Sequence, residues 1–308
     1  MRQKMLSQLK ERGYEGRVVS AEHLPELQEG IEGPRRQGLL DEELYQDYLA
    51  GFEFNPPDSL PDARSLVVVA IPHPQTRVTF TWRGEPVPAL MPPTYLHGEE
   101  ADQQVEDLLV DALSTAGYRV ARATVPKKLL SVRSGLGRYG RNNVSYAPDL
   151  GSFHRLVAFH SDLPCPDDDW SEPQMLEKCQ TCRACLRACP TGAISMERFL
   201  VQAGRCLTFH NEKPGDVPFP SGISPSAHNC LVGCLRCQKV CPENRGVLEW
   251  IEDGEKFSED ETAEILEGVP RERLSASVRE KLQRDTLMVD LEILPRNLTA
   301  LLSAVEEG

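Results

Sequence analysis

Apolar positions in the first part of this chain follow two different spacings. Leucines at helical spacing before Gly13 predict a short opening helix, and apolar residues within 44–52 predict a second one. Residues 65–71 form a short, β-branched apolar run, which fits a buried strand better than a helix. The chain therefore combines both kinds of element from its beginning.

The same mixture continues to about residue 166. Residues 100–116 place apolar side chains on one helical face, and Gly117 can end that helix. Residues 118–123 and 155–160 are typical of further strands. We therefore expect an α+β fold whose first part is an α/β domain.

Changes in composition predict three segments. A connector rich in proline and aspartate, residues 163–169, ends the first part, and most of the cysteines follow it. The acidic stretch at 252–267 is interpreted as a solvated helix face and linker, and two helical patterns come after it. The predicted domains are accordingly 1–165, 166–250 and 251–308.

Bulk properties narrow the class of protein. The longest apolar run is far shorter than the roughly 20 residues needed to cross a bilayer, and the amino end lacks a secretory signal. We therefore expect a cytoplasmic protein with no membrane association. Ten cysteines in that reducing compartment indicate metal binding or catalysis rather than disulfides. The net charge of −13 disfavours nonspecific binding to nucleic acid or anionic membranes.

Cysteine spacing carries the clearest chemistry in the sequence. Cys179, Cys182 and Cys185 are separated by two-residue gaps, and Cys189 follows directly before a proline. This is the spacing of bacterial two-cluster ferredoxins, in which three thiolates hold one 4Fe–4S cluster and the fourth cysteine ligates the other. A partial second copy begins at Cys234 and also ends in Cys-Pro.

The two copies predict two sets of cluster ligands. By reciprocity, the first 4Fe–4S cluster is expected on Cys179, Cys182, Cys185 and Cys241. The second is expected on Cys189, Cys234 and Cys237, with a fourth ligand from Cys206 or Cys230. Position alone does not choose between those two cysteines.

A pair of zinc sites is the main alternative, because Cys-x-x-Cys pairs also form tetrahedral thiolate cages. Zinc does not require a three-cysteine run closed by Cys-Pro, which favours iron–sulfur clusters. Cys165 lies outside both runs and is interpreted as an incidental thiol. The seven histidines lack the spacing of zinc hydrolases.

Several further segments, in this order, resemble the epoxyqueuosine reductase family of cobalamin and double 4Fe–4S cluster reductases, and more distantly the reductive dehalogenases. The matching segments are residues 60–65, 95–98, 135–143, 145–152 and 205–208, together with the cysteine runs. The family acts in the completion of queuosine in transfer RNA. The resemblance implies a nitroreductase-like α/β domain that holds cobalamin, a bacterial two-cluster ferredoxin-like domain and a short helical segment at the carboxyl end.

The resemblance also implies roles for particular residues. It makes Cys206 the missing ligand of the second cluster and leaves Cys230 spare. It places the cofactor-binding residues at Tyr95, Gly135, Gly137, Tyr139, Gly140 and Asn142. A reduced ferredoxin or flavodoxin-type donor would supply electrons, which pass through a cluster to the cobalamin and then to the substrate. Residues 294–297 resemble a remnant of the family's helical repeats.

One family feature is missing from this chain. Members that reduce epoxides carry an aspartate shortly before the glycine-rich segment, where it is placed to protonate the departing oxygen. This chain has no Asp or Glu between Asp111 and Asp149, and residues 121–128 stand at the corresponding place. A general acid typically contributes about 10² to 10⁴ in rate, so its absence indicates another substrate or a slow reaction. The catalytic residue is therefore unassigned.

The same interval is rich in basic residues and glycine. The basic residues are Arg119, Arg122, Lys127, Lys128, Arg133, Arg138 and Arg141. They can pair with the phosphate of tRNA or of the cofactor, or form a solvated basic face. The glycines within 135–140 either let the backbone approach a flat macrocycle or allow positive φ in a turn.

Three functions are consistent with these patterns. The first is a redox enzyme whose clusters feed a corrinoid held by the first domain. The second, favoured by the missing acid, is an electron-transfer or corrinoid-binding protein without epoxide reductase activity. The third is an RNA-binding protein that uses clusters only as structural staples.

Overall fold

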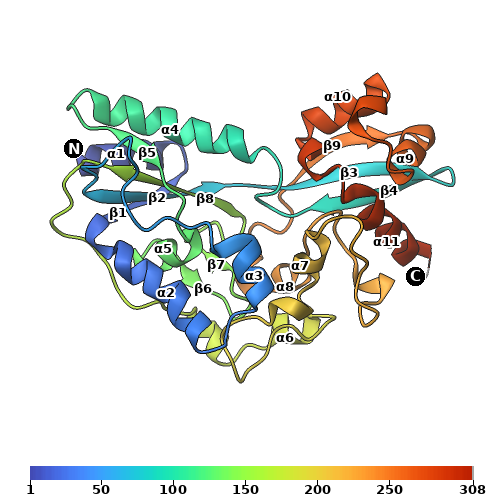
Figure 1. Ribbon diagram of the computed structural model, residues 1–308, viewed down its shortest axis with the longest axis horizontal. Helices are drawn as coiled ribbons and strands as arrows, with labels where there is room; N and C mark the ends of the chain where they lie inside the picture. Colours follow the sequence, from blue (N-terminus) through green and yellow to red (C-terminus); the bar gives the residue numbers. More distant parts are fainter. Residues whose placement is uncertain (307–308) are drawn as a thin grey trace. The chain divides into compact units, whose positions relative to one another are not determined.

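The computed structural model describes residues 1–306, which form two compact units. The first unit comprises Met1–His73, Gly98–Arg183 and Met196–Gln202, and the second comprises Pro74–His97, Ala184–Ser195 and the described residues from Ala203 onward. Both units combine helices and strands, which confirms the α+β fold class (Figure 1). The division by function into 1–165, 166–250 and 251–308 stays a prediction.

A four-stranded antiparallel sheet forms the centre of the first unit. Its order is β1 (Glu15–Ser20), β2 (Ser65–Pro72), β8 (His154–Ser161) and β5 (Val120–Arg122). Strands β2, β5 and β8 confirm the three strands predicted from the sequence. Strand β1 was missed, because its short run Glu15-Gly16-Arg17-Val18-Val19 has little apolar character.

Helices cover both faces of this sheet. On one face, α1 (Arg2–Glu11) and α4 (Gly98–Ser114) pack against Val67, Val69 and Ile71 of β2. On the other, α2 (Leu24–Arg36) and α5 (Lys127–Arg133) pack against Leu66, Val68 and Ala70 (Figure 1). Because β2 is buried on both faces, its residues 66–71 are all apolar, and its sequence shows a continuous run rather than alternation.

The remaining predicted helices of this unit are partly confirmed. Helix α1 is the opening helix, and α4 ends just before Gly117, whose φ of 78° allows the chain to turn. The helix predicted within 44–52 is shorter, consisting of α3 (Glu42–Leu44) followed by a π-helical turn, Tyr45–Leu49. A two-stranded sheet, β6 (Arg138–Tyr139) and β7 (Ser145–Tyr146), follows α5.

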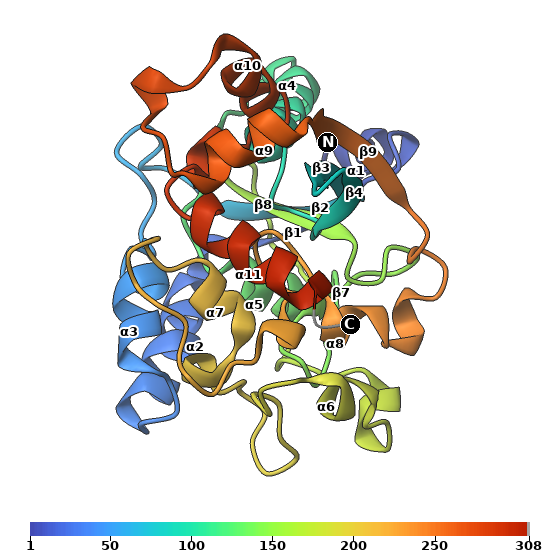
Figure 2. The ribbon, with the colours of Figure 1, turned by 90° about the vertical axis from the view of Figure 1, so that its right-hand side faces the viewer.

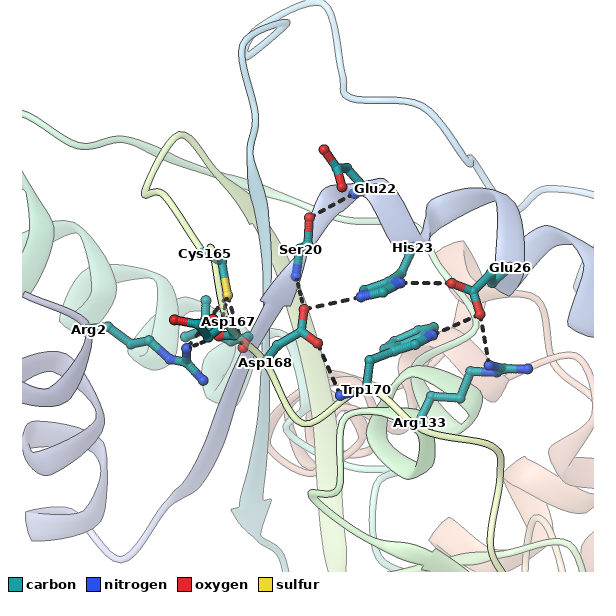
Figure 3. Close-up of polar contacts among 11 residues, drawn as sticks. Arg2, Ser20, Glu22, His23, Glu26, Arg133, Cys165, Asp167, Asp168 and Trp170 are labelled. Carbon is teal, nitrogen blue, oxygen red and sulfur yellow. Dashed lines mark hydrogen bonds and ion pairs between the residues drawn. The ribbon is translucent and has the colours of Figure 1, made fainter.

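The proline- and aspartate-rich connector is fixed to the first unit by a polar network (Figure 3). Asp168 accepts hydrogen bonds from the backbone N–H of Ser20 and from the His23 ring, whose other nitrogen contacts Glu26. The His23 ring stacks on Trp170, with ring centroids 4.2 Å apart. These contacts explain why this polar segment is ordered although its composition is typical of a linker.

Cys165 lies in the same connector, in a buried position. Its thiol is 3.4 Å from the carbonyl oxygen of Val18 and 3.7 Å from the Arg2 guanidinium (Figure 3). Burial raises the pKa of Cys165, which keeps the thiol protonated. This environment is that of a packed side chain.

The second unit contains a three-stranded sheet that the sequence analysis did not anticipate. Strands β3 (Gln75–Trp82) and β4 (Glu85–Met91) form a hairpin, whose Arg83-Gly84 turn has positive φ at both residues, 53° and 79°. This is the geometry of a type I′ turn, which matches the twist of the paired strands. Strand β9 (Ile251–Phe257) pairs in parallel with β3.

We expected the acidic stretch at 252–267 to be a solvated helix face and linker, and this prediction is wrong for its first part. Its first part lies in β9 and its second part forms α9 (Glu259–Leu266). Strand β9 is at the edge of the sheet, where Asp253 pairs with Arg77 at 2.6 Å and Glu255 pairs with Arg284 at 2.6 Å. Outward-facing charges are common on edge strands, which hides the strand from a hydrophobicity pattern.

Three helices pack with this sheet to form the core of the second unit. They are α9, α10 (Ala276–Arg284) and α11 (Leu294–Glu306), and Figure 2 shows them in the orange and red part of the chain. Phe80 of β3 stacks on Phe257 of β9 with ring centroids 5.1 Å apart. Helices α10 and α11 confirm the two helical patterns predicted near the carboxyl end.

Within residues 1–306, no helix is both long and apolar enough to span a membrane.

Candidate iron–sulfur site

Two short helices of the second unit carry equivalent positions of the two cysteine runs. Helix α6 (Ala184–Ala188) contains Cys185, and α8 (Arg236–Lys239) contains Cys237; the two helices contact each other. Each is followed by a Cys-Pro pair, Cys189-Pro190 and Cys241-Pro242. The internal repeat of the sequence is thus also a repeat of local structure.

Cys189 has an environment that stabilises a thiolate. Its sulfur accepts the backbone N–H of Ala193 at 3.3 Å and lies 3.6 Å from the Thr191 hydroxyl. Burial alone would raise the pKa of Cys189, but hydrogen bonds from Thr191, Ala193 and Ile194 bring it below its ordinary value. Ligands of iron–sulfur clusters bind as thiolates, so this environment suits the predicted role.

Cys206 and Cys230 differ in their surroundings. Cys206 is the N-cap residue of α7 (Leu207–Asn211), where the backbone N–H groups of Thr208 and Phe209 lower its pKa. Burial still raises the pKa of Cys206, and these donors offset part of the effect. Burial also raises the pKa of Cys230, whose thiol lies 3.2 Å from the amide oxygen of Asn229.

Cys234 lies close enough to both of these cysteines to influence them electrostatically. Its sulfur accepts a hydrogen bond from the Asn229 side-chain amide at 3.2 Å, and the oxygen of that amide accepts the Leu235 backbone N–H at 3.0 Å. Asn229 therefore orients the Cys234 segment. Sequence reasoning missed it, because an asparagine five residues before a ligand has no characteristic spacing.

The second predicted ligand set, Cys189, Cys206, Cys234 and Cys237, lies entirely within the second unit. The first set is divided, with Cys179 and Cys182 in the first unit and Cys185 and Cys241 in the second. Its assignment to a single cluster stays a prediction from the spacing.

The described residues do not form a compact site for a single metal ion. Four thiolates around one zinc ion would each lie about 2.3 Å from it. Among residues 1–306, no three His, Cys, Asp or Glu side chains gather closely enough to hold one metal ion. None of the ten cysteines forms a disulfide, and the eight in the two predicted sets are all partly buried. Cysteine thiolates are the ligands that hold 4Fe–4S clusters.

Tyr95, a predicted cofactor contact, lies in the second unit near these cysteines. Its hydroxyl donates to the carboxylate of Glu212, and a Cβ on Gly233 would lie only 2.8 Å from that hydroxyl oxygen. Burial raises the pKa of Tyr95 well above its usual range, and the charges of Glu212, Cys230 and Cys206 add to the effect. The hydroxyl therefore stays protonated. Glu212 is a polar partner that the sequence analysis did not identify.

Asp290 provides a prediction about pH and stability. Burial, with a smaller contribution from the charge of Glu212, raises its pKa from 3.8 to about 6. The folded state therefore holds this proton more tightly than the unfolded state, and stability falls as the pH rises from about 4 through 6. We expect Asp290→Asn to increase the free energy of unfolding at pH 7 by about 1–3 kcal/mol.

Urea unfolding of the variant and the wild type at pH 5 and pH 7 measures this effect. The advantage of Asp290→Asn should be larger at pH 7 than at pH 5. The exposed residue Glu252, changed to glutamine, serves as the control and should show no such trend. An Asp290→Asn protein that is less stable than the wild type at pH 7 would contradict the prediction.

The other predicted cofactor-binding residues lie in the first unit and have structural roles there. A Cβ on Gly137 would lie 2.9 Å from the Tyr146 carbonyl oxygen, and one on Gly140 would lie 2.5 Å from the Tyr146 ring. The buried side chain of Asn142 donates to the Tyr146 hydroxyl at 3.0 Å. Close packing on Tyr146 therefore explains these three residues without a ligand.

Gly135 and Tyr139 complete this loop. Gly135 has φ of 71° directly after α5, which is the turn geometry considered in the sequence analysis. Tyr139 lies edge-on to Phe199, with ring centroids 5.2 Å apart, and burial raises its pKa. The contact of this loop with a corrinoid stays a prediction.

Three of the seven basic residues in the basic interval of the first unit pair with carboxylates from elsewhere in the chain. Arg119 pairs with Asp162 at 3.1 Å, and Arg122 pairs with both Glu99 and Glu106 at 2.6 Å. Arg133 pairs with Glu26 and Glu172. Burial lowers the pKa of Lys127. These pairs weaken the interpretation of the interval as a free phosphate-binding patch.

Besides Glu99 and Glu106, which pair with Arg122, the structure brings Glu53 to the segment where the family aspartate is missing. The backbone N–H of Glu53 donates to the carbonyl oxygen of Thr124 at 2.8 Å, and both residues are exposed. Glu53 comes from a distant part of the chain, so its neighbourhood to residues 121–128 could not be read from the sequence.

Comparisons with known proteins agree with this description of the cysteine segment. Residues 178–244 match the family of 4Fe-4S double cluster binding domains. The epoxyqueuosine reductase of Burkholderia pseudomallei is 32% identical over 151 residues, which cover 46% of this chain and 36% of that protein. The enzyme of Bacillus cereus is 27% identical over 228 residues, which cover 69% of this chain and 58% of that protein. The chain thus spans about a third to somewhat over half of these relatives.

Solved structures show the same fold over nearly the whole chain. Epoxyqueuosine reductase from Streptococcus thermophilus aligns with a TM-score of 0.68 at 19% identity, covering 99% of this chain and 81% of that one. A structure of epoxyqueuosine reductase with a modified tRNA stem loop aligns with a TM-score of 0.67 at 22% identity, covering 98% and 81%. A catabolic reductive dehalogenase is also similar, but its TM-score of 0.38 is too low to carry an inference. The resemblance to epoxyqueuosine reductases is confirmed, in sequence and in fold.

Proposed function

We propose that this protein is an iron–sulfur oxidoreductase of the epoxyqueuosine reductase type, in which two 4Fe–4S clusters pass electrons to a corrinoid that reduces a substrate. The observation that carries the proposal is the double-cluster motif at residues 178–244, set in a fold that matches epoxyqueuosine reductase over nearly the whole chain. Both observations are needed. A cluster motif by itself is consistent with a simple electron carrier, and a fold by itself does not define an activity.

The proposed cluster ligands follow from the two cysteine runs and the hydrogen bonds of the second unit. The first cluster is assigned to Cys179, Cys182, Cys185 and Cys241, and the second to Cys189, Cys206, Cys234 and Cys237. The backbone N–H of Ala193, which donates to the Cys189 sulfur, supports the second set. Such donors stabilise the thiolates and tune the reduction potential of a cluster.

A corrinoid is the proposed electron acceptor, in keeping with the family resemblance. When bound, it would supply the chemistry that delivers electrons to a carbon centre, which no side chain can do. The protein's contribution would come from Tyr95 in the second unit and from the 135–142 loop in the first. The tight packing of that loop on Tyr146 would make it a rigid support.

The proposed partners are a low-potential electron donor of the ferredoxin or flavodoxin type and tRNA. Support for tRNA comes from the solved relative in complex with a modified tRNA stem loop. The ion pairs of Arg119, Arg122 and Arg133 reduce the positive charge that the basic interval would offer to phosphate. A cytoplasmic location also belongs to this proposal.

Anaerobic purification followed by iron, sulfide and corrinoid analysis tests the proposal directly. Two 4Fe–4S clusters require about eight iron and eight sulfide per chain. Cobalamin added to the reduced protein should bind with a changed absorption spectrum at about one equivalent. Two equivalents of zinc without sulfide would overturn the cluster assignment. Full clusters without corrinoid binding would instead support the second candidate, an electron-transfer protein, which the missing acid favours.

A further inference from the structure

A single arginine near the carboxyl end organises the loop that follows Cys206. Arg296, in the first turn of α11, donates from its two terminal nitrogens to carbonyl oxygens at 2.7–3.1 Å. The accepting residues are His210, Asn211, Lys213, Pro214 and Val217. All lie in the second unit, where Figure 2 shows α11 next to α7.

This arrangement depends on the shape of the guanidinium group. Its planar fork of donors can satisfy several carbonyl oxygens at once, which a lysine ammonium on a flexible stem does not reproduce. The group also lies over the Phe219 ring, 4.6 Å from the ring centroid. Asn297 extends the contact, since its amide oxygen accepts from Arg296 at 3.1 Å and its amide nitrogen donates to the Asn211 carbonyl at 2.9 Å. The carbonyl-rich loop thus has one common partner, the Arg296–Asn297 pair.

The loop is connected to two proposed cluster ligands by short hydrogen-bonded paths. His210 contacts the carbonyl oxygen of Gly204, two residues before Cys206, at 2.9 Å. The Asn211 amide donates to the carbonyl of Gly233, which directly precedes Cys234, at 2.8 Å. The Arg296–Asn297 pair therefore holds the end of α7, and α7 in turn links the Cys206 and Cys234 segments.

We propose that Arg296, supported by Asn297, is a positioning residue for the second 4Fe–4S cluster, and this inference rests on the proposed ligand set. It fixes the spacing of Cys206 and Cys234 and places a permanent positive charge in the same unit. A cation favours the more negative, reduced state of a nearby cluster. Residues 294–297 therefore do more than preserve a fragment of a helical repeat. They hold the segment of Cys206, the proposed ligand that lies outside both cysteine runs.

The test compares Arg296→Met, Arg296→Lys and wild-type protein after anaerobic purification. The electron paramagnetic resonance signal that disappears in Cys206→Ser identifies the second cluster. In Arg296→Met we expect the iron content to fall from about eight toward about four per chain, with loss of that signal. Any second cluster that remains should have a more negative midpoint potential than in the wild type. Arg296→Lys should restore part of the signal, because it keeps the charge but not the fork.

Two further variants separate positioning from general stability. Leu298, fully buried on the same helix, makes the matched control: Leu298→Ala should lower the melting temperature at least as much as Arg296→Met while keeping both clusters. Gly215→Ala should reproduce the cluster defect without touching Arg296, because its Cβ would clash with the Glu292 carbonyl oxygen and displace the loop.

The outcomes distinguish this inference from the proposed function. Wild-type protein without clusters would refute the proposed function itself. Wild-type protein with two clusters, together with an Arg296→Met variant whose iron content, resonance signals and potentials are unchanged, would overturn the inference alone. A cluster loss in Leu298→Ala equal to that in Arg296→Met would also overturn it, because the effect would then follow stability rather than the guanidinium contacts.

Discussion

Changing Cys206 to serine is expected to remove the second cluster, whereas changing Cys230 to serine should leave both clusters in place. Cys206 is the N-cap residue of α7, where the backbone N–H groups of Thr208 and Phe209 offset part of the rise in its pKa that burial causes. Cys230 is 1% exposed, and its burial favours a neutral thiol that interacts with Asn229. Removing a thiolate ligand from a four-cysteine cluster deprives one iron of its protein bond.

Iron and sulfide analysis of anaerobically purified protein measures this difference. Cys206→Ser should retain about four iron per chain and Cys230→Ser about eight. Cys165→Ser, which alters a buried thiol in the first unit, is the control and should also retain about eight. The reverse pattern, with iron lost only from Cys230→Ser, would exchange the roles of the two cysteines and disprove the ligand assignment.

Reduction of epoxyqueuosine by the unaltered protein is expected to be weak or absent, because residues 112–148 contain no carboxylic acid to protonate the departing oxygen. A general acid contributes about 10² to 10⁴ in rate, so the deficit should be of that order relative to a family member that has one. Thr124 is exposed, between β5 and α5, and has room for a carboxylate. We expect Thr124→Asp to recover part of the activity in a single-turnover assay with reduced, cobalamin-loaded protein.

Glu53 is the alternative candidate for the missing acid. Its backbone N–H is hydrogen-bonded to the carbonyl oxygen of Thr124, so both residues lie in the same region of the first unit. If the unaltered protein reduces the epoxide efficiently, Glu53→Gln should abolish that activity, which would make Glu53 the acid. Thr124→Asn matches the size of the aspartate without its proton and should leave the rate unchanged. Equal activity in Thr124→Asp and Thr124→Asn would show that the acid is not what limits the rate.

The sequence by itself determined the cluster chemistry and the local elements of the first unit. Cysteine spacing is a property of neighbours along the chain, and the short gaps of a ferredoxin motif restrict how thiolates can surround a cluster. Strand β2 and helix α4 were also visible, since β2 is a short continuous β-branched apolar run and α4 has apolar side chains at helical spacing. These features depend on contacts that the local sequence encodes.

The tertiary structure alone decided features that join distant parts of the chain. Strand β9 pairs with β3 across more than 170 residues, and its outward charges mask it in a hydrophobicity pattern. The environments of Cys206 and Cys230, the Tyr95–Glu212 contact and the Arg296 contacts likewise join residues of separate segments. Hydrogen bonds and packing between such segments form only when the chain folds, so no spacing in the sequence records them. The sequence therefore specified which groups could bind a cluster, and the fold decided the surroundings in which each of them lies.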